Sequence, residues 1–437
     1  MIQQICFSII CILVFNKAIR KFYQIYTNIQ LGKDEPLEGT SSSRTRNMIL
    51  FALGQKKMFT RPIAGIFHFF IYVAFLLTQV ELIEIFIDGF SGHHRAISNH
   101  IGILYPIAIN AIEMLSFLAL VATFIFLYRR NILKLIRFQK PELKGWPSLD
   151  ANLILMGEIV LVISIFLMNG ADQVLQSLGT DHYPATGTFY LSSYFGQHIL
   201  SPLSSDWLII LERMGWWLHI FIVFGFMLYL PHSKHLHIFL AFPNSYYSRL
   251  NPRGVMSNMP SIENEVRGMI GLEQKADVAE EEIFGAKDIQ QLGWRTLLEA
   301  YTCTECGRCT DVCPANLTGK KLSPRKVMMD IRDRTEEVGH LILARQHISN
   351  GDPKSFDDGK SLFDLITKEE IYACTSCNAC VEACPVLINP LNPILQLRRY
   401  DILMNSGGPA EWLPMFNSLE NNQSVWQVPE ARDAWAK

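Results

Sequence analysis

The chain has 437 residues, 49% of them hydrophobic, and a formal net charge of −2 at pH 7. Its length accommodates two or three domains, and its charge excludes nucleic-acid binding driven by bulk electrostatics. Long apolar runs fill residues 1–240, whereas 250–437 read as an ordinary soluble sequence. The sequence therefore predicts a membrane half followed by a soluble half.

Five apolar stretches in the first half are long enough to cross a bilayer, which takes roughly 20 mostly apolar residues. They lie at about 2–20, 62–87, 101–128, 151–170 and 207–231. Lys and Arg concentrate in segments 31–61 and 129–150, whereas 88–100 has only Arg95 and 171–206 has neither residue type. The positive-inside rule then places the N-terminus outside and the soluble half in the cytoplasm. Basic residues follow the first apolar stretch instead of preceding it, so no cleavable signal peptide is expected.

Several charged residues fall in or near these stretches: Glu81, Glu84, Glu113, Glu158, Glu212 and Arg213. Intramembrane charges are costly and usually face a bundle interior or a water-filled cavity. A structural pair such as Glu212–Arg213, or contact with lipid headgroups, is the simplest role for some of them. Glu81, Glu113 and Glu158 are the candidates for proton or quinone chemistry, and the sequence does not choose among them.

Histidines mark a candidate haem site. His68 lies inside the second stretch and His219 inside the fifth, while His235 and His237 follow Pro231. A buried membrane histidine can simply bond to a neighbouring helix, but a bis-histidine haem b needs two axial imidazoles, most simply from two facing helices. On an unbroken helix His219 and His237 would point the same way, about 27 Å apart. His235 stays an alternate ligand, because the chain after Pro231 need not continue as regular helix.

The stretch HIFIVFGFMLYLPHSKHLH, residues 219–237, resembles the last membrane helix of the gamma subunit of respiratory nitrate reductases. That family is a five-span cytochrome b with two haems. The resemblance implies that His68 and His237 ligate the haem nearer the cytoplasm. Thr78 stands where the family has the partner of His219, so the second haem is either missing or bound with a different sixth ligand or none. Thr78 and His219 then become candidate walls of a quinone pocket.

Two cysteine runs dominate the soluble half. Residues 303–314 read CTECGRCTDVCP, and residues 374–385 read CTSCNACVEACP. Each is C-x2-C-x2-C-x3-C-P, the run of bacterial two-cluster ferredoxins in which the fourth cysteine serves the other cluster. Zinc sites also use four cysteines, but they rarely repeat a four-cysteine run that ends in proline. Four disulfides would suit a secreted chain, which this one does not resemble.

Crossed ligation predicts two [4Fe–4S] clusters. One would be held by Cys303, Cys306, Cys309 and Cys384, and the other by Cys374, Cys377, Cys380 and Cys313.

The segments around the runs have simpler patterns. In the insertion 315–373, apolar residues recur at helical spacing, as in the alpha-helical ferredoxin domains of fumarate and heterodisulfide reductases. Its basic residues are expected on a solvated face, with a docking role as the alternative; they are Lys320, Lys321, Arg325 and Lys326. The tail carries Trp412, Trp426 and Trp435, which suggest either contact with a partner or packing on the chain's own ferredoxin domain.

The expected fold is mainly α. It comprises a five-helix transmembrane bundle (1–240), a cytoplasmic linker (241–295), an alpha-helical ferredoxin domain with two clusters (296–400) and a partner-docking tail (401–437). This combination resembles the membrane-bound iron–sulfur oxidoreductases related to heterodisulfide reductase, which include electron-transfer-flavoprotein:menaquinone reductases of bacterial inner membranes. Related fused proteins continue into cysteine-rich CCG modules. No cysteine follows Cys384 here, so the expected donor is a separate cytoplasmic CCG-type iron–sulfur or flavoprotein subunit.

The resemblance implies an electron-transfer subunit of a quinone oxidoreductase. Electrons would pass from the clusters to one haem b, or two, and then to menaquinone in the lipid bilayer. Quinol oxidation that feeds a cytoplasmic disulfide or sulfur reductase would use the same parts in reverse. A membrane-tethered iron–sulfur sensor or scaffold is the alternative from another functional class, and it predicts clusters without haem.

Overall fold

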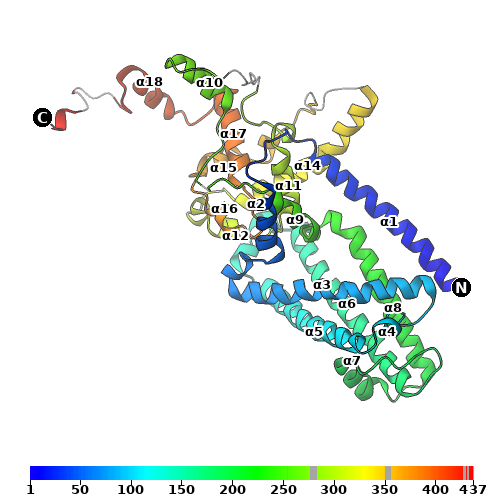
Figure 1. Ribbon diagram of the computed structural model, residues 1–437. Coiled ribbons are helices and arrows are strands. Elements are labelled where there is room, and N and C mark those ends of the chain that lie inside the picture. Colours follow the sequence, from blue (N-terminus) through cyan, green and yellow to red (C-terminus); the bar gives the residue numbers. More distant parts are fainter. Residues whose placement is uncertain (253, 276–282, 350–355, 427–429, 431–432, 437) are drawn as a thin grey trace.

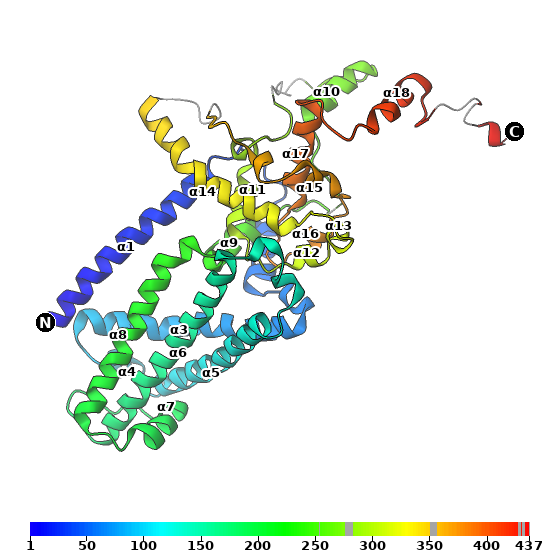
Figure 2. The ribbon, with the colours of Figure 1, turned by 180° about the vertical axis from the view of Figure 1, so that it is seen from behind.

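A computed structural model describes residues 1–437 except 253, 276–282, 350–355, 427–429, 431–432 and 437. Across the described residues the regular structure is helical and contains no β-strand, which confirms the predicted mainly α fold. Long helices form one end of the molecule, and the cysteine-rich half lies at the other end (Figure 1, Figure 2).

Five helices among the described residues are long and apolar enough to cross a membrane, as predicted. They are α1 (Ile2–Ile29), α3 (Pro62–Ser91), α5 (Leu104–Asn131), α6 (Trp146–Ser177) and α8 (Ser205–Tyr229). Helices α1, α3 and α6 extend past the apolar stretches that predicted them, whereas α5 and α8 are shifted from theirs by two or three residues. Shorter helices connect them: α2 (Ser41–Asn47), α4 (Ser98–Ile101) and α7 (Tyr190–Phe195).

The five helices pack mainly in neighbouring pairs. Helix α6 runs along α8, and α5 packs against both α3 and α6. Helix α1 contacts α3 and α8 through the fully buried ring of Phe7, which meets the rings of Phe90, Trp216 and Phe224. Gly89 makes this approach possible, because a Cβ atom at this position would lie 2.6 Å from the Phe7 ring.

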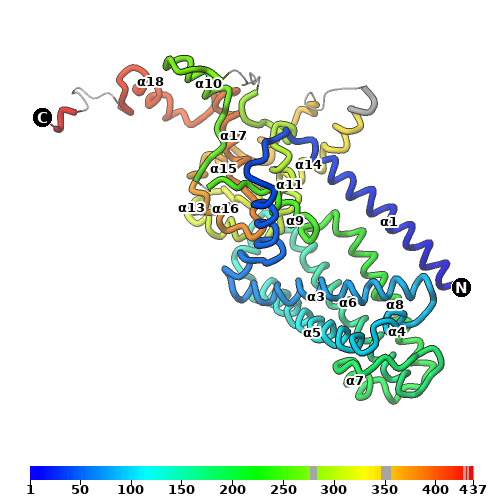
Figure 3. The backbone as a smooth tube through the Cα atoms, in the orientation of Figure 1, coloured from blue at the N-terminus to red at the C-terminus, as the bar shows by residue number. Residues whose placement is uncertain are grey.

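Helix α1 continues beyond the bundle into the cysteine-rich half, as the backbone tube shows (Figure 3). There the side-chain amide of Asn28 donates to the hydroxyl of Tyr301 at 2.9 Å. Lys21 pairs with Glu336 at 2.8 Å. The first helix therefore ties the two halves of the chain together.

The chain does not continue as one regular helix after α8. Pro231 lies in a 3-10 turn, Leu230–His232, and a second 3-10 turn, Lys234–Leu236, precedes α9 (His237–Tyr247). Because proline removes a helical hydrogen bond and clashes with the preceding turn, the helix is interrupted here. His219 and His237 consequently do not share the single helical stripe that an unbroken helix would give.

The cysteine-rich half has its own helical core. Its helices are α11 (Trp294–Thr302), α12 (Arg308–Asp311), α13 (Pro314–Leu317), α14 (Pro324–Ser349), α15 (Lys368–Ala373), α16 (Ala379–Ala383) and α17 (Leu391–Leu403). Val327 and Ile331 of α14, two of the apolar residues at helical spacing in the insertion 315–373, are fully buried. Ala286 and Ile289 belong to the same core, so its first residues precede the expected domain boundary at residue 296.

Helices α10 (Pro260–Met269) and α18 (Trp412–Asn422) lie on the side of this half away from the bundle (Figure 1). Trp412 packs edge-on against Tyr372 at a centroid distance of 5.5 Å, so this part of the tail does fold back on the chain's own domain. Trp426 and Trp435 are 72% and 88% exposed.

Helix α11 carries a buried carboxyl group. Glu299 is 5% exposed, and burial raises its pKa to about 7, although Arg249 and a backbone hydrogen bond from Asn389 act in the opposite direction. The ordinary pKa of a glutamate is about 4.3, so the unfolded chain loses this proton at a lower pH than the folded protein does. Between the two pKa values, a rise in pH therefore favours the unfolded state.

We therefore expect the folded state to lose stability, on the order of 3 kcal/mol, as the pH rises from about 4.5 to 7. The substitution Glu299→Gln should remove most of this loss, because glutamine cannot ionise. Thermal unfolding followed by circular dichroism in detergent between pH 5 and 8 measures it. Glu273→Gln is the matched control, since Glu273 is exposed. Equal pH dependence in wild type and Glu299→Gln would contradict this expectation.

Candidate functional site

The two cysteine runs form loops with the same backbone conformation. Glu305 and Ser376, each two residues after the first cysteine of its run, have φ values of 54° and 55°. Gly307 and Asn378 follow with φ values of 74° and 60°. Positive φ is uncommon outside glycine and asparagine, so the repeated pattern indicates that both loops wrap the same kind of group. Gly307 has a second reason to lack a side chain, because a Cβ atom there would lie 2.5 Å from the guanidinium of Arg325.

Each loop encloses a cavity lined by four cysteines from both runs. The first cysteine cavity contains Cys303, Cys306, Cys309 and Cys384. The second cysteine cavity contains Cys313, Cys374, Cys377 and Cys380. These groupings coincide with the crossed ligand sets expected from the sequence, and the packing of α12 against α16 brings the two runs together.

Burial keeps these thiols protonated when no metal is bound. Burial raises the pKa of the Cys303 thiol to about 11 and that of Cys384 to about 12. A buried thiol of this kind ionises when a bound metal supplies the compensating positive charge. Four cysteines lining one cavity match the number of thiolates that ligate a [4Fe–4S] cluster.

A pair of histidines lies at the end of the bundle that faces the cysteine cavities. The rings of His68 in α3 and His237 at the start of α9 have centroids 6.5 Å apart and planes inclined by 41°. A metal–imidazole bond is about 2.0 Å long, so a metal bound between two imidazoles separates their centroids by roughly 6 Å. The spacing of the two rings therefore fits one metal held by both.

Hydrogen bonds orient both rings for this role. His237 Nδ1 lies 2.9 Å from the carbonyl oxygen of Lys234, and His68 Nδ1 lies 3.0 Å from the Gln55 side-chain oxygen. Because these oxygens accept, each Nδ1 donates, which leaves each Nε2 with a free lone pair. Metal-binding histidines commonly use their second nitrogen in this way. Burial also lowers the pKa of His237, which keeps its imidazole neutral and able to bind a metal.

The other candidate histidines differ in their surroundings. His235 lies beside His237, with centroids 5.6 Å apart, and so remains near the pair. His219 is buried between α8 and α6, where its Nδ1 approaches Ser164 Oγ at 3.3 Å and the Leu161 carbonyl at 3.4 Å. Thr78 bonds to the carbonyl of Phe75 in its own helix. The contacts of His219 are thus those of a histidine bonded to a neighbouring helix.

Two polar bridges join the histidine pair to the first cysteine cavity. Lys234, whose carbonyl holds His237, pairs through its ammonium with Glu305 at 2.5 Å. On the other side, Arg308 donates to the carbonyls of Lys57 at 2.9 Å and Met58 at 3.3 Å. The same segment of chain carries Gln55, the partner of His68. The first cysteine cavity is therefore the one that lies next to the histidines.

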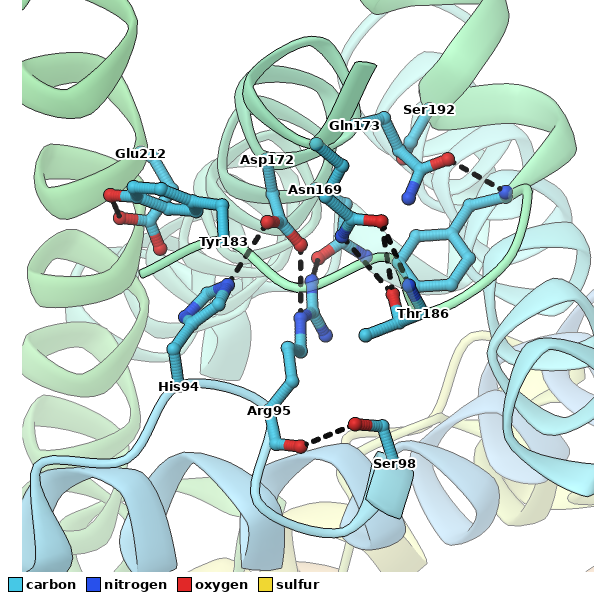
Figure 4. Close-up of polar contacts among 12 residues, drawn as sticks. His94, Arg95, Ser98, Asn169, Asp172, Gln173, Tyr183, Thr186, Ser192 and Glu212 are labelled. Carbon is cyan, nitrogen blue, oxygen red and sulfur yellow. Dashed lines mark hydrogen bonds and ion pairs between the residues drawn. The ribbon is translucent and has the colours of Figure 1, made fainter. Parts of the chain in front are cut away.

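A second polar site lies at the opposite end of the bundle and is centred on the buried guanidinium of Arg95 (Figure 4). Arg95 donates to Asp172 at 3.1 Å and to the side-chain oxygen of Asn169 at 2.5 Å. His94 contacts the other Asp172 oxygen at 3.0 Å. Sequence reasoning did not single out these four residues; the signal was a lone arginine in a segment otherwise free of Lys and Arg.

Asn169 brings two of the predicted carboxylates together. Its side-chain nitrogen lies 3.2 Å from Glu81 and 3.4 Å from Glu113. Glu158 is elsewhere in the bundle and accepts from Thr123 at 3.1 Å. The predicted Glu212–Arg213 pair is present, with a Tyr183 hydroxyl donating to Glu212 at 3.2 Å. The structure therefore groups Glu81 with Glu113 and leaves Glu158 and Thr78 apart from them.

One expectation about basic residues is wrong. Arg325 was expected on a solvated face of the insertion, but it is fully buried and lines the first cysteine cavity. Its guanidinium pairs with Glu142 at 2.8 Å and donates to the carbonyl of Arg137 at 2.9 Å. Both partners come from the segment between α5 and α6, so the burial of Arg325 arises from a contact distant in sequence. Lys321 does lie on an exposed face, where it pairs with Glu369.

Comparison with known proteins identifies the cysteine loops. Residues 302–388 match the 4Fe-4S dicluster domain family. The chain is 28% identical over 93% of its length to "Probable iron-sulfur-binding oxidoreductase FadF" of Bacillus subtilis (strain 168), of which it covers 57%. It is 26% identical over 90% of its length to "EtfAB:quinone oxidoreductase" of Syntrophomonas wolfei subsp. wolfei (strain DSM 2245B / Goettingen), of which it covers 54%. The chain thus spans just over half the length of these two relatives.

A third relative matches a shorter region. The "Probable membrane-anchored ferredoxin" of Chromohalobacter salexigens is 30% identical over 29% of the chain, which covers 20% of that protein. No solved structure matches the chain. These findings confirm the resemblance to membrane-bound iron–sulfur oxidoreductases, and they support iron–sulfur clusters in this chain.

The crossed assignment of ligands has a direct test. We expect Cys306→Ser and Cys384→Ser to abolish the same electron paramagnetic resonance signal of the reduced protein, because both sulfurs line the first cysteine cavity. Cys313→Ser should abolish the other signal, although it is closer in sequence to Cys306. Cys6→Ser, in the first helix, serves as the control and should retain both signals and full iron content. Loss of one signal in both Cys306→Ser and Cys313→Ser, with Cys384→Ser affecting the other, would refute crossing.

Proposed function

We propose that this chain is the electron-transfer part of a membrane quinone oxidoreductase. It would carry electrons from a cytoplasmic donor through two [4Fe–4S] clusters and a haem b to menaquinone. The observation that carries the proposal is the pair of facing imidazoles beside the first cysteine cavity. Bound clusters and haem supply one-electron steps, and the residues of the chain fix where these steps occur.

The order of the centres follows from the contacts. Cys377 in the second cysteine cavity is exposed, whereas the first cavity is joined to the histidine pair by Lys234 and Arg308. A soluble donor would therefore meet the second cavity, and the first cavity would lie between it and the membrane. A name such as "EtfAB:quinone oxidoreductase" on a relative supports a quinone as the final acceptor.

The haem would be held by His68 and His237. Neither Nε2 atom has a hydrogen bond to a described residue, and the ring separation of 6.5 Å would suit two imidazole ligands of one iron. His219 is not assigned a haem here, because Thr78, at the position expected opposite it, carries no imidazole and bonds within its own helix. Its place is better suited to the wall of a quinone pocket.

The cluster of carboxylates around Arg95 is the candidate for proton handling. Glu81, Glu84 and Asp172 all lie within 3.6 Å of the single Arg95 guanidinium, and Glu113 joins them through Asn169. Buried charges are stable only when they are paired. Even with His94 charged against Asp172, two cations do not balance four carboxylates, so we expect some of these carboxylates to hold protons on which quinone reduction can draw.

The orientation of the chain is also a proposal. The basic segments between α1 and α3 and between α5 and α6 contact the cysteine-rich half through Arg61, which pairs with Asp311, and Lys140, which bonds to Asn316. All three parts therefore lie on one side of the bundle. The excess of basic residues assigns that side to the cytoplasm.

Optical spectroscopy of the purified chain tests the haem. We expect a reduced b-type α band that is lost in His68→Ala and in His237→Ala, because each removes an axial ligand. His235→Ala is the matched control and should keep the band, since the neighbouring His237 already faces His68. A haem-free protein that holds both clusters would reject the proposal in favour of a membrane-tethered sensor or scaffold.

Reoxidation kinetics test the acceptor. In membrane vesicles, haem and clusters reduced by dithionite should reoxidise when a water-soluble menaquinone analogue is added under anaerobic conditions. The substitution Glu81→Gln together with Glu113→Gln should slow this step at least tenfold, because it removes protonatable groups without opening a cavity. Arg129→Gln, on the opposite side of the bundle, is the control. Unchanged reoxidation in the double variant would remove these two carboxylates from the proposal.

A further inference from the structure

The two cysteine loops are alike in backbone and unlike in charge. In the first loop Arg308 follows Gly307, whereas Ala379 occupies the equivalent place after Asn378. Both Arg308 and Arg325 line the first cysteine cavity. The residues that line the second cysteine cavity in the described part of the chain carry no charge other than that of the cysteines.

Arg308 brings an uncompensated positive charge to the first cavity. It is 4% exposed. Its hydrogen-bond partners among the described residues are neutral oxygens and a sulfur: the carbonyls of Lys57 and Met58, the hydroxyl of Thr60 and the Met58 thioether. A buried cation without a carboxylate partner is costly, and a negatively charged group in the adjacent cavity would relieve that cost.

Arg325 adds a second buried guanidinium. One of its nitrogens pairs with Glu142, a second donates to backbone carbonyls, and its Nε has no hydrogen-bond partner among the described residues. The nearby carboxylate Glu305 does not offset Arg308, because it is already held between Lys234 at 2.5 Å and Arg332 at 2.9 Å. Lys234 and Arg332 also pair with Asp150 and Asp333, so the charge that distinguishes the first cavity is that of Arg308, which has no carboxylate partner among the described residues.

Among the described residues, the cation bonded to the backbone of a second-cavity cysteine is Arg398, and it lies outside the lining. Arg398 is half-buried and donates to the carbonyls of Ile371 and Cys374. The two cavities differ less in the solvent exposure of their cysteines than in the charge of the residues around them. Each cavity has two buried cysteines, and the remaining two are half-buried except for the exposed Cys377. Charge is consequently the main physical difference between the two sites.

We propose that Arg308 and Arg325 make the first cysteine cavity the stronger electron acceptor of the two. A thiolate-bound [4Fe–4S] cluster carries a negative charge that grows by one when it accepts an electron, and nearby cations stabilise that added charge. One electron leaves the second cavity and one arrives at the first, with no bond or proton exchanged. Electrons that enter at the exposed second cavity then settle beside His68 and His237. This inference rests on the proposed function only for the presence of both clusters.

A redox titration of the full chain in detergent, followed by electron paramagnetic resonance, tests the proposal. The signal that Cys306→Ser abolishes should have the higher midpoint potential, and the signal that Cys377→Ser abolishes the lower. Arg308→Gln should shift the first signal to lower potential and leave the second in place. Arg308→Lys keeps the charge and should restore most of the wild-type value. Arg398→Gln is the matched control, and it should lower only the second signal.

The wild-type order of potentials is decisive even if Arg308→Gln does not accumulate in folded form. A lower potential for the signal assigned to the first cavity would overturn the proposal. So would an Arg308→Gln variant in which both signals stay at their wild-type potentials. The optical band tests the haem assignment, and reoxidation tests the quinone assignment. Either assignment can fail without changing the potentials of the two cluster signals.

Discussion

Cations that reach across the junction between the helical bundle and the cysteine-rich half determine how this molecule is arranged. Arg308 is solvated by carbonyls of the segment before α3, Arg325 by the segment between α5 and α6, and Lys234 by Glu305. Removing one partner of a buried ion pair such as Arg325–Glu142 costs about 3–5 kcal/mol. Neither half can therefore satisfy its own buried groups alone. The same contacts place the histidine pair beside the first cysteine cavity.

Features that depend on local sequence patterns were predictable. The helical spans follow from runs of apolar residues, and the cysteine loops from their spacing. Features that depend on contacts distant in sequence were not. Arg325 is buried only because Glu142 and the Arg137 carbonyl reach it from the membrane half. Glu81 and Glu113 are brought together by Asn169, which comes from a third helix. Trp412 contacts Tyr372 because the tail folds back on the cysteine-rich half.

The two ends of the bundle bury polar groups of different charge. At the end near the cysteines, neutral imidazoles face one another and their outer nitrogens donate to fixed oxygens. At the opposite end, carboxylates outnumber the cations around Arg95. His219 lies between these sites in sequence but shares the polar contacts of neither; it bonds to Ser164 in α6. His219 and His237, which an unbroken helix would place on one stripe, therefore lie in different polar surroundings.

The difference in charge between the two cysteine cavities is large enough to influence which of two bound clusters would hold an electron. At an effective dielectric constant of about 20, a unit charge roughly 6 Å from another contributes about 3 kcal/mol. That energy corresponds to a change of about a hundredfold in the equilibrium constant for electron transfer between the two sites. Glu142 cancels part of the effect of Arg325, but the partners of Arg308 are neutral. Two loops with one backbone conformation can thus differ in electron affinity through a single position, arginine in one and alanine in the other. The arginine also anchors the loop to the membrane half, so the contact that positions the first cavity is the one that sets its charge.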